Sequence, residues 1–478
     1  MIADRYPLFL AGRALTTEFE QVVTDKYTGE IVSRVARAGP DMVERAIVAA
    51  VEAFEQTRRM PAFERQAILE HVVRRVRERH DEFSEALAIE AGKPISTARG
   101  EVTRLIDTLR LAAEEATRVT GETLPLDISP RAASYEGLWR RAPIGPCGFI
   151  TPFNFPMNLV AHKIGPAIAM GCSWILKPAP QTPIGALLLG EILAETDLPA
   201  GAFSILPCNV EDAAPLVEDD RLRLLSFTGS PGVGWSLKAR AGRKKVLLEL
   251  GGNAACIVDR NADLELAAER ITAGAFYQSG QSCISVQRVF IHRSVYKELT
   301  TMLTERARAL KSGNPLDEDT FLGPLISEDE TRRVEAWIKE AVDAGARLLC
   351  GGERDGRFIS ATYLENVGAE SKLSCVEVFG PVATLEPFDD FDDAIRRAND
   401  SRFGLHAGVF TNSLEHALRA YDELDVGGVV INDTSNTRVD NMPYGGVKHS
   451  GLGREGIRFA MQEMSEIKLL VFNRIGKA

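Results

Sequence analysis

The sequence predicts an α/β protein built around a doubly wound parallel sheet. From Gly145 onward, short apolar runs of strand-like composition alternate with helical segments, the pattern that parallel sheets with covering helices produce. Before that point, apolar residues recur three and four apart, as they do in amphipathic helices. The chain has 478 residues, of which 45% are hydrophobic, so it is long enough to form two or three domains with their own cores.

Helices are expected throughout the first third of the chain. The apolar spacing predicts helices over Asp41–Phe54, Glu64–Lys93 and Glu101–Val119. The second of these ends at Gly92, a residue suited to the C-cap because it adopts left-handed backbone angles without strain, and Pro94 follows it.

Five strand-like runs follow, with the sequences CGFITP, SWILKP, AFSILP, RLLSFTG and KVLLELGG. A helix is predicted to start after the second run, because Thr182 and Pro183 form an N-terminal signal. Parallel sheets bind ligands beyond the carboxyl ends of their strands. The residues at these ends are therefore candidates for a functional site: Asn154, Lys177, Gly229 and Glu249.

A second α/β region is predicted after Glu249, with helices near Asp263–Gln278 and Glu328–Ala344, and it ends in a glycine-rich stretch that favours tight loops around a site. The segment SEIKLLVFN near the C-terminus has the composition of a strand. Together with residues 131–143 it is predicted to form a small projecting sheet, whose open edge would need another subunit to cover it.

Charge and cysteine content narrow the classes of partner. A net charge of −11 argues against nucleic acid or an anionic membrane surface as the main partner, and favours small molecules. No apolar run approaches the roughly 18 residues that span a bilayer, and the first residues lack the apolar core of a secretory signal, so a cytoplasmic location is expected. The 7 cysteines are scattered without metal-ligand spacing, which fits a reducing compartment and no metal site.

Cys283 differs from the other cysteines in its surroundings. In the stretch FYQSGQSCISVQR it stands among small and polar residues that would make a poor core but leave room for another molecule. These neighbours favour Cys283 as a nucleophile.

Seven segments together resemble the aldehyde dehydrogenase superfamily, most closely its lactaldehyde dehydrogenase branch, over nearly the whole chain. They occur in the family's order: ITPFNFPMNL (150–159), ILKPAPQTP (175–183), SFTGSPGVG (226–234), LLELGGN (247–253), SGQSC (279–283), EVFGP (377–381) and MPYGGVKHSGLGREG (442–456). The resemblance implies an aldehyde dehydrogenase-like fold with a dinucleotide-binding domain at 1–122 and 144–250, a catalytic domain at 251–457, and a β oligomerisation extension at 123–143 and 458–478. The C-terminal strand, whose edge another subunit would cover, predicts a homodimer or homotetramer.

In the chemistry that this resemblance implies, a cysteine thiolate adds to the aldehyde to form a thiohemiacetal, which loses a hydride to become a thioester. Cys283 would be the nucleophile and the side-chain amide of Asn154 would donate a hydrogen bond to the oxyanion. Glu249 would be the base that activates water to hydrolyse the thioester, so the acyl group would not pass to coenzyme A.

The resemblance also implies how a dinucleotide would be held. Gly229 and Gly234 are five residues apart, as in the family's variant of the phosphate-binding turn, and Ser230 would help to hold phosphate. Lys177 and Glu377 would bind ribose hydroxyls, and Phe379 would support the nicotinamide side. Many NAD-preferring members carry a glutamate three positions after the lysine, where this chain has Pro180, so NAD is favoured while NADP stays possible.

The branch that the sequence resembles oxidises short hydroxyaldehydes such as lactaldehyde and glycolaldehyde, and this substrate type is the leading hypothesis. Relatives acting on phosphorylated aldehydes or succinate semialdehyde often carry an arginine where this chain has Ser282 or His162. Arg438 is the remaining candidate anchor for a substrate carboxylate.

Alternatives stay open at this point. Arg438 could instead pair with Asp433 or Asp440, and if it binds substrate the enzyme would be a succinate semialdehyde dehydrogenase or a related semialdehyde dehydrogenase. A non-catalytic binding protein on a dehydrogenase scaffold is the competing class, and the presence of all three predicted catalytic residues argues against it.

Overall fold

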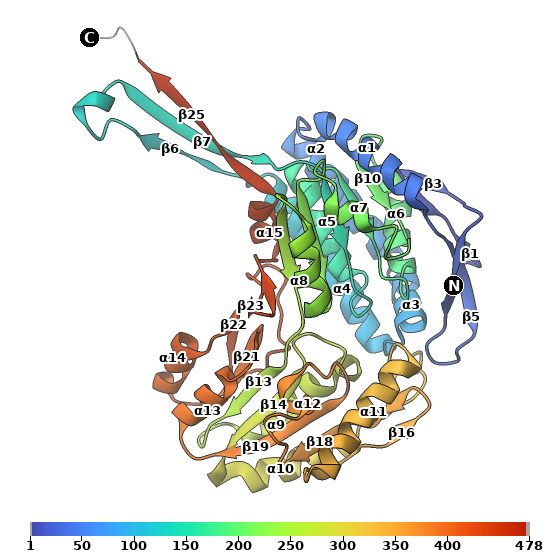
Figure 1. Ribbon diagram of the computed structural model, residues 1–478, viewed down its shortest axis with the longest axis vertical. Helices are drawn as coiled ribbons and strands as arrows, with labels where there is room; N and C mark the ends of the chain where they lie inside the picture. The colour runs from blue at the N-terminus through green and yellow to red at the C-terminus, as the bar shows by residue number, and fades with distance from the viewer. Residues whose placement is uncertain (1, 475–478) are drawn as a thin grey trace.

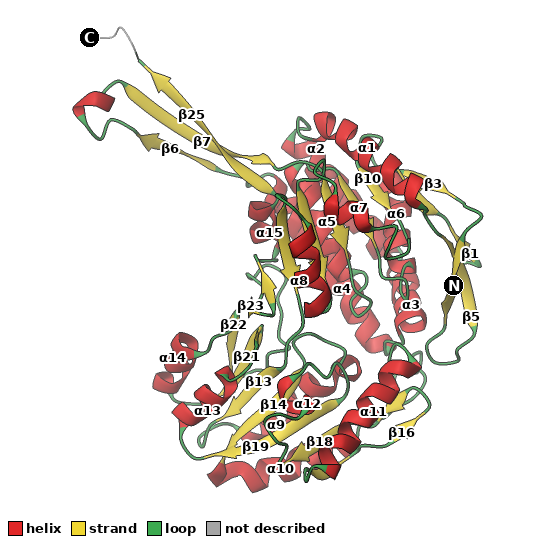
Figure 2. Cartoon of the chain, in the orientation of Figure 1, coloured by secondary structure: helices red, strands yellow, loops and turns green. Residues whose placement is uncertain are grey.

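The computed structural model describes residues 2–474. Two α/β units stack on each other, and a long narrow sheet projects from the side of the first unit (Figure 1). Each unit has a central sheet flanked by helices (Figure 2). This is the α/β architecture that the sequence predicts.

The first unit is organised around an eight-stranded sheet of order β24-β12-β11-β8-β9-β10-β2-β3. Its middle strands run parallel and correspond to the five predicted apolar runs: β8 (Cys147–Ile150), β9 (Trp174–Lys177), β10 (Phe203–Ile205), β11 (Leu224–Thr228) and β12 (Lys245–Glu249). These strands are almost entirely buried, as expected for a parallel sheet covered on both faces. The antiparallel strands β2 (Leu8–Leu10) and β3 (Arg13–Leu15) complete one edge of this sheet. A separate three-stranded sheet contains β1 (Arg5–Tyr6), β5 (Ile31–Ala36) and β4 (Glu20–Thr24), in which β5 pairs in parallel with β1 and antiparallel with β4.

The first unit contains the helices α1 (Pro40–Thr57), α2 (Ala62–Glu78), α3 (His80–Ala91), α4 (Ile95–Ala116), α5 (Asn158–Met170), α6 (Ile184–Ala194), α7 (Ala214–Glu218) and α8 (Pro231–Arg240). They pack through buried apolar faces, and α2, α3 and α4 do so mainly on α5, α6 and one another. The single helix predicted over residues 64–93 is wrong, because the chain breaks at Arg79 (φ −107°, ψ 19°) into α2 and α3. There the guanidinium binds Glu82 and Glu191, which ties the break to α6. The predicted end at Gly92 is confirmed, with φ +66°.

The second unit contains a seven-stranded sheet of order β15-β18-β19-β14-β13-β21-β22. Except for the antiparallel edge strand β15 (Arg347–Cys350), its strands run parallel: β18 (Thr362–Glu365), β19 (Val382–Phe388), β14 (Val286–His292), β13 (Ala254–Val258), β21 (His406–Phe410) and β22 (Gly428–Ile431). The covering helices are α9 (Leu264–Phe276), α10 (Arg293–Arg308), α11 (Glu328–Asp343), α12 (Lys372–Cys375), α13 (Phe391–Asn399) and α14 (Leu414–Glu423).

The last part of the chain returns from the second unit to the first. β24 (Gly451–Leu452) pairs with β12, and α15 (Ile457–Glu463) packs against α4 and α5. β25 (Ser465–Asn473) then pairs with β7 (Tyr135–Pro143), which also pairs with β6 (Gly121–Pro125).

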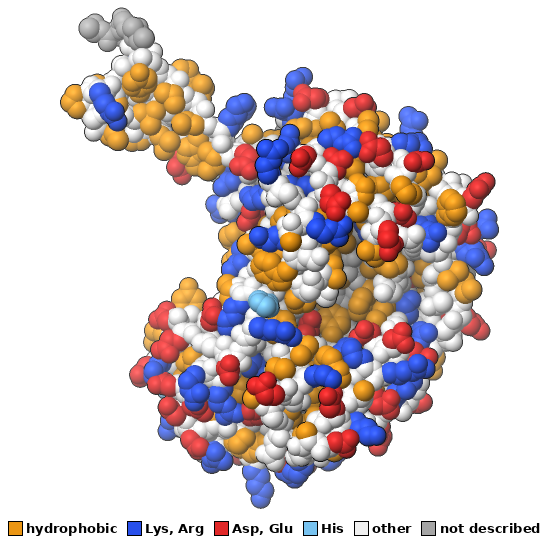
Figure 3. All heavy atoms as spheres, viewed as in Figure 1, with side chains coloured by type: hydrophobic (Ala, Val, Ile, Leu, Met, Phe, Trp, Pro, Cys, Tyr) orange, Lys and Arg blue, Asp and Glu red, His pale blue; other side chains and the backbone are white. Residues whose placement is uncertain are grey.

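These three strands form the projecting sheet. Both faces of β25 are exposed, with large apolar side chains at Ile467, Leu469, Leu470, Val471 and Phe472. Figure 3 shows hydrophobic side chains gathered over this projection. Residues 475–478, which the sequence assigned to the same extension, lie outside the described residues. Among residues 2–474, the structure has no helix with the length and apolarity needed to cross a membrane.

Candidate active site

A cavity of about 580 Å³ lies between the two units, and we call it the central cavity. Its size suits a small ligand together with part of a cofactor. Most of the site residues predicted from the sequence line it: Asn154, Gly229, Ser230, Glu249, Cys283, Glu377, Phe379 and Arg438. Lys177 and Gly234 lie outside its wall, at the end of β9 and within α8.

The loop between α9 and β14 carries Cys283 and has unusual backbone angles. Gln278, Ser279 and Gly280 are consecutive residues with positive φ (52°, 54° and 70°). At Gly280 a Cβ atom would lie 2.1 Å from the carbonyl oxygen of Gly380, so only glycine fits. A strained turn held by its surroundings is typical of functional loops, and here it directs the cysteine into the cavity.

Side chains of the same loop anchor it to the segment that follows α10. The Ser279 hydroxyl donates to the carbonyl of Gly323 at 2.7 Å, and the Gln281 side-chain oxygen accepts from the Ile326 N–H at 3.0 Å. All of these groups are buried or nearly so. The loop is thereby fixed before any substrate arrives.

Cys283 Sγ lies 3.2 Å from the hydroxyl oxygen of Tyr444. Burial raises the pKa of the thiol to about 12, and the hydrogen bond from Tyr444 acts in the opposite direction. The thiolate is the reactive form, so groups that stabilise the anion are important here.

Asn154 follows β8 and is held against the cysteine loop. Its Nδ2 donates to the carbonyl of Gln281 at 3.0 Å, while the Gln278 side-chain amide donates to the Asn154 carbonyl. The second proton on Nδ2 has no partner among the described residues and remains available for an oxygen in the cavity.

Glu249 ends β12 and is buried. Its Oε2 has no hydrogen-bond partner within the described chain. Burial, followed by the negative charge of Glu455, raises the pKa of Glu249 well above its usual value, while Arg438 and Lys163 oppose the shift. A carboxylate with a raised pKa accepts protons readily, as a general base must.

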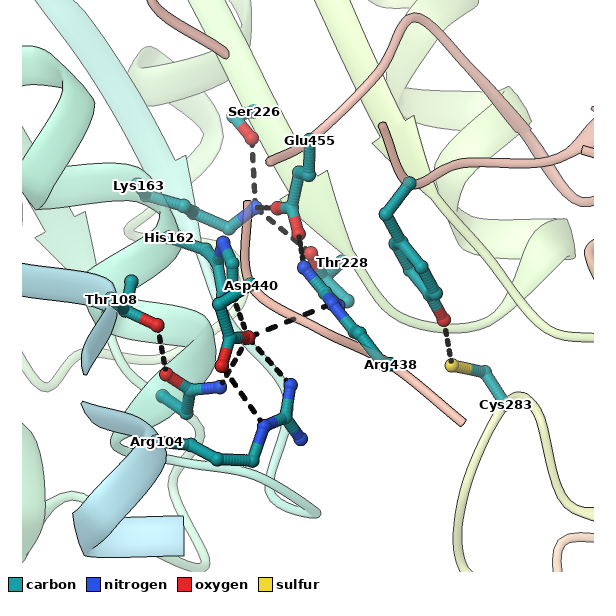
Figure 4. A network of polar contacts seen from close by, with 12 residues as sticks. Arg104, Thr108, His162, Lys163, Ser226, Thr228, Cys283, Arg438, Asp440 and Glu455 are labelled. Carbon is teal, nitrogen blue, oxygen red and sulfur yellow. Dashed lines mark hydrogen bonds and ion pairs between the residues drawn. The ribbon is translucent and has the colours of Figure 1, made fainter. Parts of the chain in front are cut away.

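Behind these groups lies a buried ionic network (Figure 4). Lys163 donates to Glu455 at 3.1 Å and to the hydroxyls of Ser226 and Thr228 at 2.8 Å each. Arg438 Nη2 donates to the other oxygen of Glu455 at 3.1 Å. Burial disfavours the charged form of Glu455, yet Lys163 and Arg438 lower its pKa to about 2.

A second part of the network surrounds Asp440, which accepts from Arg104 at 2.7 Å and lies 2.8 Å from His162 Nε2. Arg438 Nε lies 4.0 Å from the same carboxylate. Asp433, the other partner considered from the sequence, pairs with Arg270 instead. Arg438 is thus engaged by Glu455 and, more distantly, by Asp440.

Sequence reasoning missed several of these side chains. Tyr444 and Glu455 stand within the MPYGGVKHSGLGREG segment, so the motif itself could have indicated them. Arg104 also lines the central cavity, but it belongs to α4 and is far in sequence from every motif. Only the packing of α4 beside α5 brings Arg104 to the site.

The other end of the cavity can receive a dinucleotide. Ser230 is the N-cap of α8 and its side chain makes no capping bond, so this helix N-terminus has free N–H groups beside the cavity that Ser230 lines. At Gly234 a Cβ would lie 2.4 Å from a methyl of Leu250, so glycine allows α8 to approach the end of β12.

Glu377 and Phe379 form the opposite wall. Glu377 accepts from the Gly252 N–H at 3.1 Å, and burial raises its pKa to about 8. Phe379 meets Phe153 edge-on at 5.8 Å between ring centroids. A helix N-terminus, a carboxylate and an aromatic wall are the groups that pyrophosphate, ribose and nicotinamide require, so the residues present fit such a cofactor.

Lys177 is largely buried at the end of β9, and its ammonium group has no hydrogen-bond partner among residues 2–474. Burial lowers the pKa of this lysine, while the charges of Cys208 and Glu211 act in the opposite direction. A cation without a partner is suited to bind an incoming oxygen ligand.

Comparison with known proteins agrees with this geometry. The profile of the aldehyde dehydrogenase family matches residues 15–470. The chain is 43% identical over 470 residues to a 3-sulfolactaldehyde dehydrogenase of Priestia aryabhattai, with 98% of each chain covered. It is 39% identical over 475 residues to a lactaldehyde dehydrogenase of Methanococcus maripaludis, covering 98% of this chain and 100% of the relative.

A solved structure shows the same fold at high similarity. The structure of aldehyde dehydrogenase 21 from Physcomitrella patens, in complex with the reaction product succinate, aligns with a TM-score of 0.98 at 47% identity, and the match covers 100% of both chains. The predicted resemblance is therefore confirmed: this chain belongs to the aldehyde dehydrogenase family and is an NAD(P)-dependent aldehyde dehydrogenase that acts on small aldehydes.

Proposed function

We propose that this enzyme oxidises a short aldehyde to its carboxylic acid, with Cys283 as nucleophile, Asn154 as oxyanion donor and Glu249 as base. The observation that supports this assignment most strongly is that all three side chains line one cavity although they come from distant places in the chain: the loop after β8, the end of β12 and the loop between α9 and β14. The combination of a nucleophile, an oxyanion donor and a base matches what acyl chemistry through a thioester requires.

In the first half-reaction, the Cys283 thiolate attacks the aldehyde carbon and forms a C–S bond, while the carbonyl oxygen becomes an oxyanion. The free proton of Asn154 Nδ2 then donates to that oxygen. Bound NAD(P) supplies the hydride acceptor, which leaves the acyl group on Cys283 as a thioester.

In the second half-reaction, Glu249 takes a proton from water as the water oxygen attacks the thioester carbon. The C–S bond breaks, the acid leaves, and Cys283 is again a thiolate. Gly445 gives this step room, because a Cβ there would stand 3.0 Å from Glu249 Oε1.

NAD is our preferred cofactor, with NADP accepted less well. Pro180 stands three residues after Lys177, at the position where a carboxylate would repel the 2′-phosphate of NADP. This barrier to NADP is therefore missing. Glu211 supports the preference for NAD, because its negative charge acts on Lys177 and would disfavour a phosphate nearby. Roles for Lys177, Ser230 and Glu377 in holding the cofactor follow from the same proposal.

For the substrate, we propose a short hydroxyaldehyde of the lactaldehyde or glycolaldehyde type. The names of two relatives, a lactaldehyde dehydrogenase and a 3-sulfolactaldehyde dehydrogenase, support a small hydroxylated aldehyde. The partly buried thiol of Cys283 packs beside Tyr444 and Ile284, which line the same cavity.

A second candidate is an aldehyde with a carboxylate or sulfonate at its far end, such as succinate semialdehyde. Arg104 favours this candidate, because its side chain lines the cavity and is 30% exposed. Its Nε and Nη2 donate to Asp440, while Nη1 has no partner among residues 2–474. A free guanidinium nitrogen can bind an anion. The succinate bound to the moss relative is consistent with this alternative. Arg438, which pairs with Glu455, adds positive charge to the wall of the same cavity.

The test is a measurement of kcat/KM for lactaldehyde, glycolaldehyde, succinate semialdehyde and 3-sulfolactaldehyde, each with NAD and with NADP, by the absorbance of the reduced nicotinamide. Cys283→Ala is expected to abolish every signal. If the anionic aldehydes are preferred, Arg104→Met should reduce their kcat/KM roughly tenfold or more relative to lactaldehyde, since a charge-assisted hydrogen bond is lost. The ratio of kcat/KM for an anionic aldehyde to kcat/KM for lactaldehyde cancels any loss of activity that the substitution causes with every substrate. Product formed at an undiminished rate by Cys283→Ala would refute the proposal.

We also propose that the enzyme is a cytoplasmic homodimer or homotetramer, with residues 1–122 and 144–250 as the cofactor domain, 251–457 as the catalytic domain, and 123–143 with 458–478 as the oligomerisation extension. Free thiols at all 7 cysteine positions support a reducing location. The apolar exposure of β25 supports self-association.

A further inference from the structure

Tyr444 is a buried residue that the steps above do not use. It stands in the loop after β22 with 2% of its surface exposed, and its hydroxyl oxygen lies 3.2 Å from Cys283 Sγ. It also lines the central cavity. A phenol beside the proposed nucleophile therefore needs a role.

The position of this phenol is fixed from several sides. The guanidinium of Arg438 lies over the ring at 3.7 Å from its centroid, and His406 packs against it at 4.9 Å. The backbone N–H of Tyr444 donates to the Glu455 carbonyl at 3.0 Å, and the Glu455 N–H donates back at 2.7 Å. Because Glu455 also binds Arg438, the cation and the ring are held by one residue.

Charge decides the direction of the hydrogen bond. A thiolate has no proton, so it can only accept, and the phenol must then donate. Hydrogen bonds to an ionised partner are roughly twice as strong as neutral ones. The contact therefore favours the charged form of the cysteine. Arg438 over the ring draws electron density from the phenol and makes its proton a better donor.

We propose that Tyr444 is a further catalytic residue, whose hydroxyl donates a hydrogen bond to the Cys283 thiolate and stabilises it for attack. This role rests on the proposed function of Cys283 as nucleophile. When the C–S bond forms, the sulfur loses its charge and the hydrogen bond weakens. When that bond breaks after hydrolysis, the charge returns to sulfur and Tyr444 stabilises the leaving thiolate.

Tyr444 does not itself act as a base in this scheme. Burial, together with the nearby thiol charge, raises the pKa of the phenol well above its usual value, so it keeps its proton at neutral pH. A protonated phenol is what a hydrogen-bond donor requires.

The test is the rate of alkylation of Cys283 by iodoacetamide at about pH 8 in cofactor-free enzyme, followed for that one cysteine by mass spectrometry of its peptide. Well below the pKa of the thiol this rate is proportional to the thiolate fraction, so Tyr444→Phe, which keeps the ring but removes the donor, is expected to lower it about 10- to 100-fold. Tyr277→Phe is the matched control, because it removes a hydroxyl from the same cavity that makes no hydrogen bond to Cys283. Exposed Cys375 gives an internal reference whose alkylation rate should stay the same.

An unchanged alkylation rate in Tyr444→Phe would overturn the proposal. If the variant does not fold, enzyme carrying 3-fluorotyrosine supplies a second measurement: a more acidic phenol should raise the alkylation rate of Cys283, and no change or a fall would also overturn it. Alkylation needs no aldehyde turnover, so a failed assignment of Cys283 in catalysis would appear separately, as activity that persists in Cys283→Ala.

Discussion

Of the two groups that the proposed reaction needs in their charged forms, Glu249 is buried and Cys283 is partly buried. Burial raises the pKa of Cys283 to about 12 and that of Glu249 well above its usual range. Both groups must lose a proton to act, so each shift reduces the active fraction at lower pH. Activity is therefore expected to rise as the pH increases.

Replacement of Glu249 by glutamine separates the two half-reactions. We expect Glu249→Gln to keep a burst of reduced cofactor close to one equivalent, because Cys283 and Asn154 remain, while steady-state kcat falls about 10²–10⁴-fold. Stopped-flow absorbance measures the burst and the steady-state rate. In the unmodified enzyme, kcat should fall as the pH drops through a pKa above that of an ordinary glutamate. The exposed residue Glu370 provides the control Glu370→Gln, and loss of the burst in Glu249→Gln would contradict the assigned role.

How far the site residues could be predicted depends on where they stand in the chain. Cys283, Asn154 and Glu249 each belong to a short segment with a recognisable pattern, and the structure brings them to one cavity. Arg104 belongs to an ordinary helical pattern, where its charge resembles that of any surface arginine. Its place in the cavity wall follows from the packing of α4 against α5, a contact between distant parts of the chain.

At the scale of elements, buried carboxylates fix the helices that carry the site. Glu101 Oε1 accepts from the N–H groups of Met157 and Asn158 at 3.0 and 3.1 Å, at the start of α5, and the same carboxylate binds buried Lys93. This arrangement satisfies free N–H groups that every helix N-terminus has. It also orients the segment that contains Asn154.

The loop that carries Cys283 yields a second prediction. Gly280→Ala places a side chain where φ is +70° and the carbonyl oxygen of Gly380 stands 2.1 Å from the new atom, so the free energy of unfolding should fall by about 1–3 kcal/mol and activity should decrease. Gly100→Ala, in α4 with no atom within 4 Å, should instead raise stability by about 0.5–1 kcal/mol. Chemical denaturation measures both, and equal stability of the two variants would show that the loop is not constrained as described.

Elements with a strong local signal were predictable. The apolar runs that form β8 to β12 and the end of α3 at Gly92 all follow from local composition. The break at Arg79 does not, because helical spacing continues across it and the turn depends on Glu191, which is remote in sequence. Tertiary contacts of this kind override local propensity.

At the scale of the whole molecule, the projecting sheet of β6, β7 and β25 has apolar faces that nothing else among the described residues of a single chain covers. Apolar side chains on both faces of β25 meet solvent, which a separate soluble chain seldom tolerates over such a length. A second copy of the chain is the proposed cover.

A double substitution, Leu469→Lys with Val471→Lys, should weaken that association, because each new charge would have to lose its water at the interface. Sedimentation velocity is expected to show a dimer or tetramer for the unmodified protein and a smaller species for the variant. Phe19→Lys is the control and should not change the size: Phe19 is an exposed apolar residue directly before β4, and β4 belongs to the sheet with β5 and β1, which lie on the other side of the molecule from the projecting sheet (Figure 1). A monomer at micromolar concentration before any substitution would refute the proposed assembly.

The return of the chain through β24, α15 and β25 also fixes the order in which the enzyme is completed during synthesis. Cys283 leaves the ribosome long before Tyr444, before the strand that pairs beside Glu249, and before β25. Domains form largely as they emerge. A chain that stops before Tyr444 would therefore hold the sulfur of Cys283 without the hydroxyl beside it or the strand that closes the first sheet. In the proposed mechanism, the nascent protein thus becomes competent for oxidation only after these residues have been made.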